Sequence, residues 1–182
     1  MVLSFAGLFC FTIYMIILYT GNGKGKTTAS IGQTIRALGE GKKALMIQFI
    51  KGPWKSGEDY FFQKTKNFQI IKAGKGFVGI LGDRLPLASH KKAAKDALKL
   101  ADKKILSKKN DLVILDEINV AVGLKLISEK DVLKVLKRIP YGVDVILTGR
   151  NAPKTFIDLA DIATEMKEIK YKFNPAKQGI EY

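Results

Sequence analysis

Short apolar runs alternate along the chain with stretches whose apolar residues recur at helical spacing. The apolar runs predict buried strands at residues 15–19, 44–50, 68–72, 112–115 and 143–147, and we expect a last strand at 165–169. Helices are predicted over residues 26–38, 87–107 and 128–138, with another after Asn151. Strands that alternate with helices are typical of βα units, so the pattern predicts a mostly parallel central sheet with helices on both faces.

The predicted helix at residues 87–107 has the clearest two-sided pattern. Lysine covers one face, and the other carries Ala94, Ala97, Leu98, Ala101, Ile105 and Leu106. Because side chains three and four positions apart share one side of a helix, this stripe is expected to pack on the sheet as core. The glycine-bearing stretches 51–63 and 74–82 lack such a pattern and are predicted to be loops.

Two helix starts carry capping signals. Ser128 with Asp131 resembles a capping box, in which each residue satisfies a backbone N–H of the first turn. Asn151 is expected to cap the following helix, with Pro153 in its first turn, where a missing N–H costs nothing.

Composition narrows the chemistry. The chain has 182 residues, a net charge of +14 and a pI near 9.8, which suits anionic partners. Lysine is scattered rather than clustered with arginine and aromatic residues, so we do not expect nucleic acid as the partner. A single cysteine, Cys10, and a single histidine, His90, leave too few ligands for a zinc site and too few groups for a catalytic triad. His90 is expected to be a surface residue at a helix start.

A glycine-rich loop joins the first predicted strand to the first helix. It reads Gly21, Asn22, Gly23, Lys24, Gly25, Lys26, Thr27 and Thr28. Glycines let successive backbone N–H groups face an anion, and the helix start adds its positive end. Lys26 would then lie between phosphates, and Thr27 would offer its hydroxyl to Mg²⁺. The usual pattern G-x-x-x-x-G-K-[ST] begins with glycine, where this chain has Thr20, so Gly21 and Gly23 are expected to compensate. The loop predicts that this chain binds ATP in a P-loop nucleotide-binding fold of the RecA-like kind.

Charged side chains follow two other predicted strands. Asp116 and Glu117 end the run at 112–115, where P-loop folds hold magnesium directly or through water, and the sequence does not separate the two as ligands. Arg150 follows the strand at 143–147 and would emerge at the same edge of the sheet, within reach of a phosphate. Lys26 and Arg150 are therefore the candidate catalytic residues, and Thr27, Asp116 and Glu117 the candidate metal ligands.

The apolar N-terminus is the least regular part of the chain. Residues 2–19 are long enough for a membrane-spanning helix, but a phosphate loop needs a strand at 15–19. That leaves residues 1–14, which are too short to span, so we do not expect a membrane anchor. They are expected to be an apolar extension of a single domain over residues 15–182, either upstream of the natural start at Met15 or a short element covering the site.

These motifs, taken in order, resemble those of the ATP:corrinoid adenosyltransferases. The similarity covers nearly all of the chain from Met15 onward. It includes the loop with its missing first glycine, and four further segments: residues 48–52 (Gln-Phe-Ile-Lys-Gly), 115–118 (Leu-Asp-Glu-Ile), 148–150 (Thr-Gly-Arg) and 176–182 at the C-terminus.

The resemblance implies a reaction. Reduced cobalt(I) of a corrinoid attacks the 5′ carbon of ATP, and inorganic triphosphate leaves intact. Cobalt(I) is itself a strong nucleophile, so no general base is needed, and the protein would orient the ribose and neutralise the leaving triphosphate. The resemblance also implies that ATP lies reversed along the loop relative to kinases. The corrinoid is left open between cobyrinic acid a,c-diamide and complete cobalamin.

The resemblance further implies an aromatic lid that excludes the lower axial ligand of cobalt. The family pattern there is Gly-Phe-x-Trp, and this chain has Gly76, Phe77, Val78 and Gly79. Phe77 is thus the candidate corrinoid residue, and Gly79 replaces the tryptophan. The only tryptophan, Trp54, lies in another predicted loop.

Two other functions fit part of the sequence. A RecA-like ATPase or nucleotide-binding module, acting on nucleic acid, would explain the loop, the carboxylates and the charge, but not the motifs after Arg150. A small-molecule kinase would need an arginine-rich lid, and the four arginines are not clustered. The resemblance implies a cytoplasmic enzyme with a flavodoxin-type or other reductase as partner, and it allows a homodimer.

Overall fold

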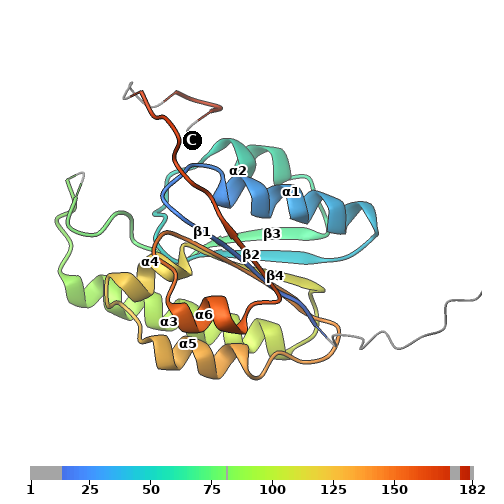
Figure 1. The fold of residues 1–182 in the computed structure, drawn as a ribbon. Coiled ribbons are helices and arrows are strands. Elements are labelled where there is room, and N and C mark those ends of the chain that lie inside the picture. Colours follow the sequence, from blue (N-terminus) through green and yellow to red (C-terminus); the bar gives the residue numbers. More distant parts are fainter. Residues whose placement is uncertain (1–13, 81, 173–176, 181–182) are drawn as a thin grey trace, which may run out of the picture.

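The computed structural model describes residues 14–80, 82–172 and 177–180 (Figure 1). Six strands form one sheet in the order β3-β2-β4-β5-β1-β6, and every neighbouring pair is parallel. Their bounds are β1 Ile16–Thr20, β2 Ala44–Gln48, β3 Phe68–Lys72, β4 Leu112–Asp116, β5 Asp144–Thr148 and β6 Ile162–Glu165.

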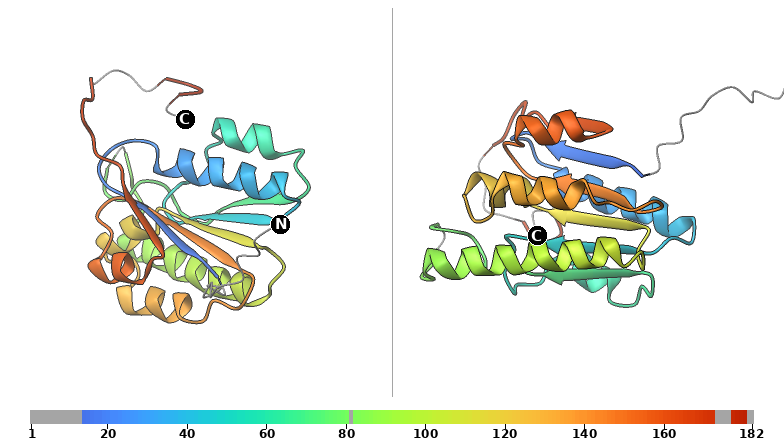
Figure 2. Two further views of the ribbon diagram at one scale, coloured as in Figure 1. Left: turned by 45° about the vertical axis from the view of Figure 1, so that its right-hand side comes forward. Right: turned by 90° about the horizontal axis from the view of Figure 1, so that it is seen from below.

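Helices cover both faces of the sheet, as the alternating pattern predicted (Figure 2). One face carries α1 (Lys26–Gly39) and α2 (Gly57–Phe62). The other carries α3 (Leu87–Leu106), α4 (Ile118–Gly123), α5 (Glu129–Leu136) and α6 (Lys154–Leu159). The arrangement confirms the α/β fold of P-loop type, with a sheet that is parallel throughout.

The central strands are apolar all along because both of their faces are buried. All five residues of β4 are buried, and so are all five of β2. The alanine-rich stripe of α3 packs on one face as expected, although Leu106 at its end is 39% exposed. The register brings Gln48, Asp116 and Thr148 next to one another at the carboxyl edge, which fixes where polar chemistry can gather.

Four expected boundaries were wrong, and the first is that of the strand expected at 44–50, which ends at Gln48. The last strand is Ile162–Glu165 rather than 165–169, because residues from Met166 on leave the sheet to cross the glycine-rich loop. Asn151 does not cap α6: its backbone is left-handed, with φ 53°, and Pro153 itself holds the N-cap position. Helix α5 ends at Leu136, although its start is confirmed, since the Ser128 hydroxyl accepts from the N–H of Asp131.

Two short helices were not predicted. Helix α2 lies in the stretch taken as loop, and its start is a capping box in which Asp59 accepts from the Ser56 N–H at 2.7 Å. Helix α4 begins directly after Glu117 and carries no polar cap in the sequence. The first could have been found from the Ser-x-x-Asp spacing at its start.

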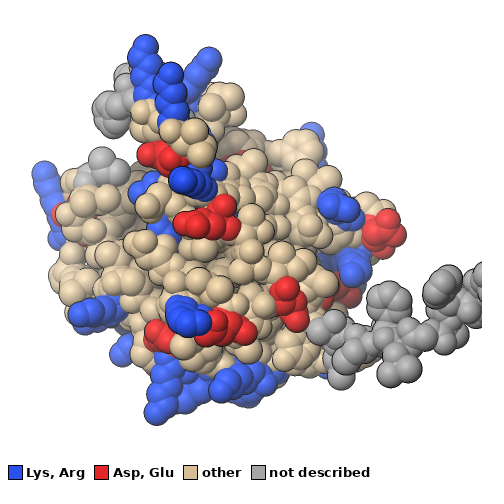
Figure 3. All heavy atoms as spheres, viewed as in Figure 1, with Lys and Arg blue, Asp and Glu red and all other residues tan. Residues whose placement is uncertain are grey.

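The surface is basic but mixed. In Figure 3 lysine and arginine occur around the whole outline of the visible face, with acidic side chains between them. This distribution agrees with scattered lysine on solvated faces rather than with one basic groove. Among the residues that the structure describes, no helix is both long and apolar enough to cross a membrane. The expected extension at residues 1–14 lies, except for Tyr14, outside the described residues.

Candidate functional site

The glycine-rich loop, residues 21–25, leaves the carboxyl end of β1 and opens α1. The Lys26 side chain is only 7% exposed, and its Nζ donates to the carbonyls of Gly21 at 2.8 Å and Gly23 at 2.6 Å. Burial lowers the pKa of Lys26, Glu117 opposes that effect, and Arg150 adds to the lowering. The ammonium thus lies under the loop, where it donates to two backbone carbonyl oxygens.

The segment after β6 crosses this loop and explains two of its glycines. The N–H of Gly23 donates to the Met166 carbonyl at 2.6 Å. A Cβ at Gly21 would lie 2.5 Å from that carbonyl oxygen, and one at Gly23 would lie 2.8 Å from the Lys167 carbonyl carbon. We expected both glycines to free N–H groups for an anion. Instead they make room for residues 166–167, and the N–H of Gly23 is already used.

Thr20, in place of the usual first glycine, has a contact of its own. Its hydroxyl oxygen accepts from the N–H of Ala152 at 3.1 Å. This bond ties the start of the glycine-rich loop to the turn that carries Arg150.

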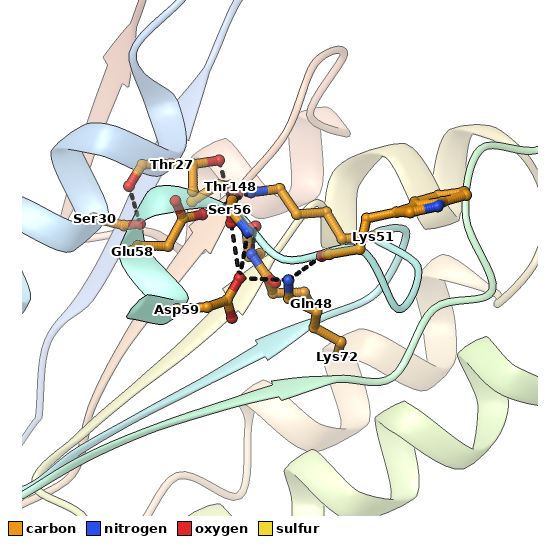
Figure 4. Close-up of polar contacts among 11 residues, drawn as sticks. Thr27, Ser30, Gln48, Lys51, Ser56, Glu58, Asp59, Lys72 and Thr148 are labelled. Atoms are coloured by element: carbon orange, nitrogen blue, oxygen red, sulfur yellow. Dashed lines mark hydrogen bonds and ion pairs between the residues drawn. The ribbon is translucent and has the colours of Figure 1, made fainter. Parts of the chain in front are cut away.

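Asp116 is the centre of a buried hydrogen-bond network, and its partners Thr27, Gln48 and Thr148 are labelled in Figure 4. Its Oδ1 accepts from the hydroxyls of Thr27 at 2.9 Å and Thr148 at 2.8 Å, and its Oδ2 accepts from Gln48 Nε2 at 3.0 Å. The carboxylate is fully buried and joins the ends of β2, β4 and β5 to the first turn of α1.

Glu117 lies beside this network but faces the open pocket. Its backbone is left-handed, with φ 61°, and its N–H donates to the Thr148 hydroxyl at 2.9 Å. Burial, with Asp116 next, raises the pKa of Glu117 to about 7, although Lys26, Lys51 and Arg150 act in the opposite direction. This carboxylate therefore sits among the cations of the site.

The pocket at this edge has a volume of about 710 Å³. It brings together seven of the eight predicted loop residues, from Asn22 to Thr28, with Glu117 and Arg150. Lys51 of the β2–α2 connection and Glu58 of α2 also line it, and their side chains pair at 3.0 Å. Burial lowers the pKa of Lys51, but Asp116 and Glu58 outweigh burial and hold that pKa above its usual value.

The far wall of the pocket comes from the end of the chain. Glu168, Tyr171, Gly179 and Ile180 line it, and Lys24 Nζ donates to the Ile180 carbonyl at 2.8 Å. Sequence reasoning missed Lys51, Glu58 and these C-terminal residues as pocket residues. The matching motifs at 48–52 and 176–182 were the available signal for Lys51, Gly179 and Ile180.

Phe77 and Asp116 are not among the described residues that line this pocket. Phe77 is 48% exposed in the loop after β3, so it is not a core residue. The Trp54 indole lies on the glycine next to it: a Cβ at Gly76 would meet the ring at 3.0 Å, and one at Gly52 would meet it at 2.8 Å. Trp54 is 66% exposed, so its ring rests on two glycines and leaves most of its surface free.

His90 was expected at the surface and is instead 2% exposed. Its Nε2 lies 3.0 Å from Asp83 Oδ2, and the same Asp83 carboxylate accepts from the N–H groups of Gly79 and Leu85. Helical spacing places His90 one turn into α3, where it turns inward to hold the loop that follows Phe77.

The side chains around the pocket include possible ligands for a magnesium ion. Within residues 14–80, 82–172 and 177–180, no three His, Cys, Asp or Glu side chains form a metal-binding group. Magnesium in nucleotide sites takes few protein ligands and completes its shell with phosphate oxygens and water. The Thr27 hydroxyl and the Glu117 carboxylate, which follows β4, both line the pocket and meet that smaller requirement, so the residues fit the ion.

Known proteins are similar to this sequence over nearly its full length. The sequence model of the family described as ATP:corrinoid adenosyltransferase BtuR/CobO/CobP matches residues 13–182. The chain belongs to this family. The match begins before β1 and includes every element of the ATP:corrinoid adenosyltransferase fold described above.

Individual members of the ATP:corrinoid adenosyltransferase family agree. A corrinoid adenosyltransferase from Sinorhizobium sp is 37% identical over 174 residues, which cover 92% of this chain and 80% of that protein. Corrinoid adenosyltransferase CobA from Salmonella typhimurium is 35% identical over 173 residues, or 92% and 85% of the two chains. The corrinoid adenosyltransferase from Escherichia coli K12 is 34% identical over 172 residues, with the same two shares. The resemblance and the enzyme class that the motifs indicated are therefore confirmed.

Proposed function

We propose that this chain transfers the 5′-deoxyadenosyl group of ATP to the cobalt(I) of a corrinoid. Cobalt supplies the electron pair of the new cobalt–carbon bond and is formally oxidised to cobalt(III). The bond between C5′ and its oxygen breaks, and its electron pair leaves with triphosphate. The observation that carries the proposal is one pocket that unites Lys26, Thr27, Glu117 and Arg150 in a member of this family.

Lys26 and Arg150 are proposed to bind the triphosphate and stabilise the charge that grows on it. Lys26 now donates to two carbonyls of its own loop, which phosphate oxygens would replace as stronger, charged acceptors. Arg150 reaches the pocket from the carboxyl end of β5. Donors fixed in place before the reaction stabilise a leaving anion without the cost of reorganising solvent.

Thr27 and Glu117 are proposed to hold magnesium, and Asp116 to orient them. Asp116 is fully buried and already accepts three hydrogen bonds, whereas Glu117 lines the pocket. A bound ion would help neutralise the triphosphate. Asp116 would then act on the ion through Thr27, which favours the water-mediated or indirect alternative for this carboxylate.

The corrinoid is proposed to lie against Phe77 and Trp54. Both aromatic side chains are exposed at the same edge of the sheet as the ATP pocket, and Gly76 brings the two loops into contact. A flat, largely apolar macrocycle gains most from rigid aromatic surface. The Lys72 side chain donates to the Trp54 carbonyl and pairs with Asp59, which fixes the loop beneath the indole.

The reaction can be tested directly. Purified protein is incubated without oxygen with magnesium, ATP and chemically reduced cob(I)alamin, and the cobalt–carbon product is followed by absorbance while the phosphates are separated. We expect adenosylcobalamin and intact triphosphate in equal amounts. ADP and orthophosphate without a cobalt–carbon product would instead support the RecA-like ATPase.

A reductase of flavodoxin or other type, a homodimer and a cytoplasmic location remain predictions of the same proposal. Cobalt(II) needs one electron to reach cobalt(I), the state that attacks C5′. An electron donor is therefore part of the proposed reaction sequence.

A further inference from the structure

The Thr148 hydroxyl makes two hydrogen bonds that point in different directions. It donates to Asp116 Oδ1 at 2.8 Å and accepts from the Glu117 N–H at 2.9 Å. Thr148 is fully buried at the end of β5, next to Asp116 at the end of β4. One hydroxyl from a neighbouring strand thus joins the Asp116 carboxylate to the backbone of Glu117, the two residues that the sequence could not tell apart as ligands.

Glu117 needs such a contact because its backbone is strained. A left-handed conformation is unfavourable for a residue with a Cβ, and it persists only where surrounding contacts fix it. The turn reverses the direction of the two side chains, so that Asp116 is buried beneath the pocket while Glu117 lines it. The Thr148 hydroxyl is the partner of the Glu117 N–H within this turn.

We propose that Thr148 is a positioning residue for the adenosyl transfer. Its hydroxyl holds Glu117 in the left-handed turn that presents the carboxylate to the magnesium–triphosphate complex, and it fixes the Asp116 oxygen that also binds the Thr27 hydroxyl. The inference rests on the proposed function and adds a residue that contacts neither substrate. Residues that orient the ligands of a metal typically change metal affinity or activity 10- to 100-fold when removed.

The chain offers a matched control for this hydroxyl. Thr34, in α1, is also fully buried, and its hydroxyl donates to the Ser30 carbonyl at 2.9 Å within the helix, away from both carboxylates. Thr148→Val and Thr34→Val each remove one buried hydroxyl and keep the branched shape. Thr148→Ser keeps the hydroxyl and removes a methyl group.

Three measurements are made on wild type and the three variants: melting temperature, calorimetric Kd for ATP with magnesium and with EDTA, and kcat/KM for cob(I)alamin adenosylation. We expect Thr148→Val to weaken ATP binding about tenfold with magnesium and less than about twofold in EDTA. Its kcat/KM should fall at least about 30-fold. Thr34→Val and Thr148→Ser should stay within about threefold of wild type in binding and turnover.

Several outcomes would overturn the proposal. Equal losses of ATP affinity and kcat/KM in Thr148→Val and Thr34→Val would mean that Thr148 acts only through stability, as any buried hydroxyl would. If Thr148→Val weakened ATP binding equally with magnesium and with EDTA, Thr148 would not act through the metal ion. If Thr148→Val does not fold, a large loss in folded Thr148→Ser would still show that the hydroxyl is not the active feature. A wild type that binds ATP but makes no adenosylcobalamin would refute the proposed function instead, and the binding results would still test Thr148.

Discussion

Lys26 lies under the glycine-rich loop with two backbone carbonyls as partners, in the place where phosphate oxygens are proposed to bind. Replacing it with alanine removes a charge that the leaving triphosphate needs. We predict that Lys26→Ala lowers kcat/KM at least about 100-fold, the usual loss for one donor to a developing anion, while the melting temperature changes by a few degrees. Lys42→Ala is the control, because Lys42 lies at the opposite edge and pairs loosely with Asp144 at 3.8 Å. Near-normal turnover in Lys26→Ala would contradict the assignment.

Glu117 gives a pH dependence whose sign can be worked out. Its pKa is near 7 in the folded protein, against 4.5 for an ordinary glutamate. Between these values the folded chain holds a proton that the unfolded chain has released, so stability falls as pH rises. Without magnesium and nucleotide, wild type should lose at most about 3 kcal/mol relative to Glu117→Gln between pH 4.5 and 7, and nothing more above. Urea unfolding of both proteins measures this difference, and a flat or rising difference would show that the Glu117 pKa is not raised.

Residue roles were only partly predictable. The sequence placed Lys26, Thr27, Glu117 and Arg150 correctly at one edge, because loop and strand ends fix where such side chains emerge. It could not decide which of Asp116 and Glu117 faces the pocket. The two side chains point in different directions because the Glu117 backbone is left-handed, and the residue type does not predict that conformation. His90 was wrongly expected at the surface, because the spacing of apolar residues does not predict its buried contact with Asp83.

At the scale of elements, the glycine-rich loop depends on the segment that crosses it. A Cβ at Gly23 would lie 2.7 Å from the Met166 carbonyl oxygen, so Gly23→Ala must push residues 166–167 off the loop. We predict a lower melting temperature and at least about tenfold weaker ATP binding, since losses above 1 kcal/mol are usual for such clashes. Gly32→Ala is the matched control, because a Cβ at Gly32 in α1 meets nothing within 4 Å. The free energy of unfolding of this variant should rise by about 0.5–1 kcal/mol.

Calorimetry with ATP and thermal melting of both glycine variants decide this point. Loss of ATP binding in Gly32→Ala would show that any added methyl near the loop is harmful. Unchanged binding in Gly23→Ala would show that residues 166–167 are not needed to shape the loop.

The connection between β2 and α2 joins the two proposed substrates, because it carries Lys51 into the ATP pocket and Trp54 beside Gly76. We predict that Trp54→Ala raises KM for the corrinoid about five- to tenfold, the value of one aromatic contact, and leaves the Kd for ATP within about twofold. Phe61→Ala, which removes another exposed aromatic side chain from α2, should change neither. A Trp54→Ala enzyme that loses ATP affinity instead would place adenine, not the corrinoid, against the indole.

Elements with strong periodicity were predicted well, and those held by single contacts were not. The first five strands and α3 follow from apolar runs and a helical stripe, because these apolar side chains must pack between the sheet and its helices. Helix α2 depends on the capping box of Ser56 and Asp59, and β6 ends where Met166 turns to Gly23, four positions after it begins. Such short elements are set by tertiary partners, which a window of local sequence does not contain.

For the whole molecule, the net charge of +14 is best understood as a solvated basic surface that also attracts anions. Lysine and arginine lie around the outline of the face seen in Figure 3, with acidic side chains between them. Cations also converge inside the pocket, where Lys26, Lys51 and Arg150 each act on Glu117. The proposed leaving group, triphosphate, matches that convergence better than adenosine does.

This gives a prediction for the stability of the whole chain. A ligand that binds only the folded state stabilises it by about 2.7 kcal/mol at 100 times its Kd. For a domain of this size that shift corresponds to a melting temperature about 5–10 °C higher. Inorganic triphosphate with magnesium should therefore raise the melting temperature nearly as much as ATP, and adenosine should raise it little. Lys26→Ala should lose both shifts while Lys42→Ala keeps them. If adenosine stabilised the chain more than triphosphate, the main binding energy would lie on the base, and the glycine-rich loop would not be the site that holds the leaving group.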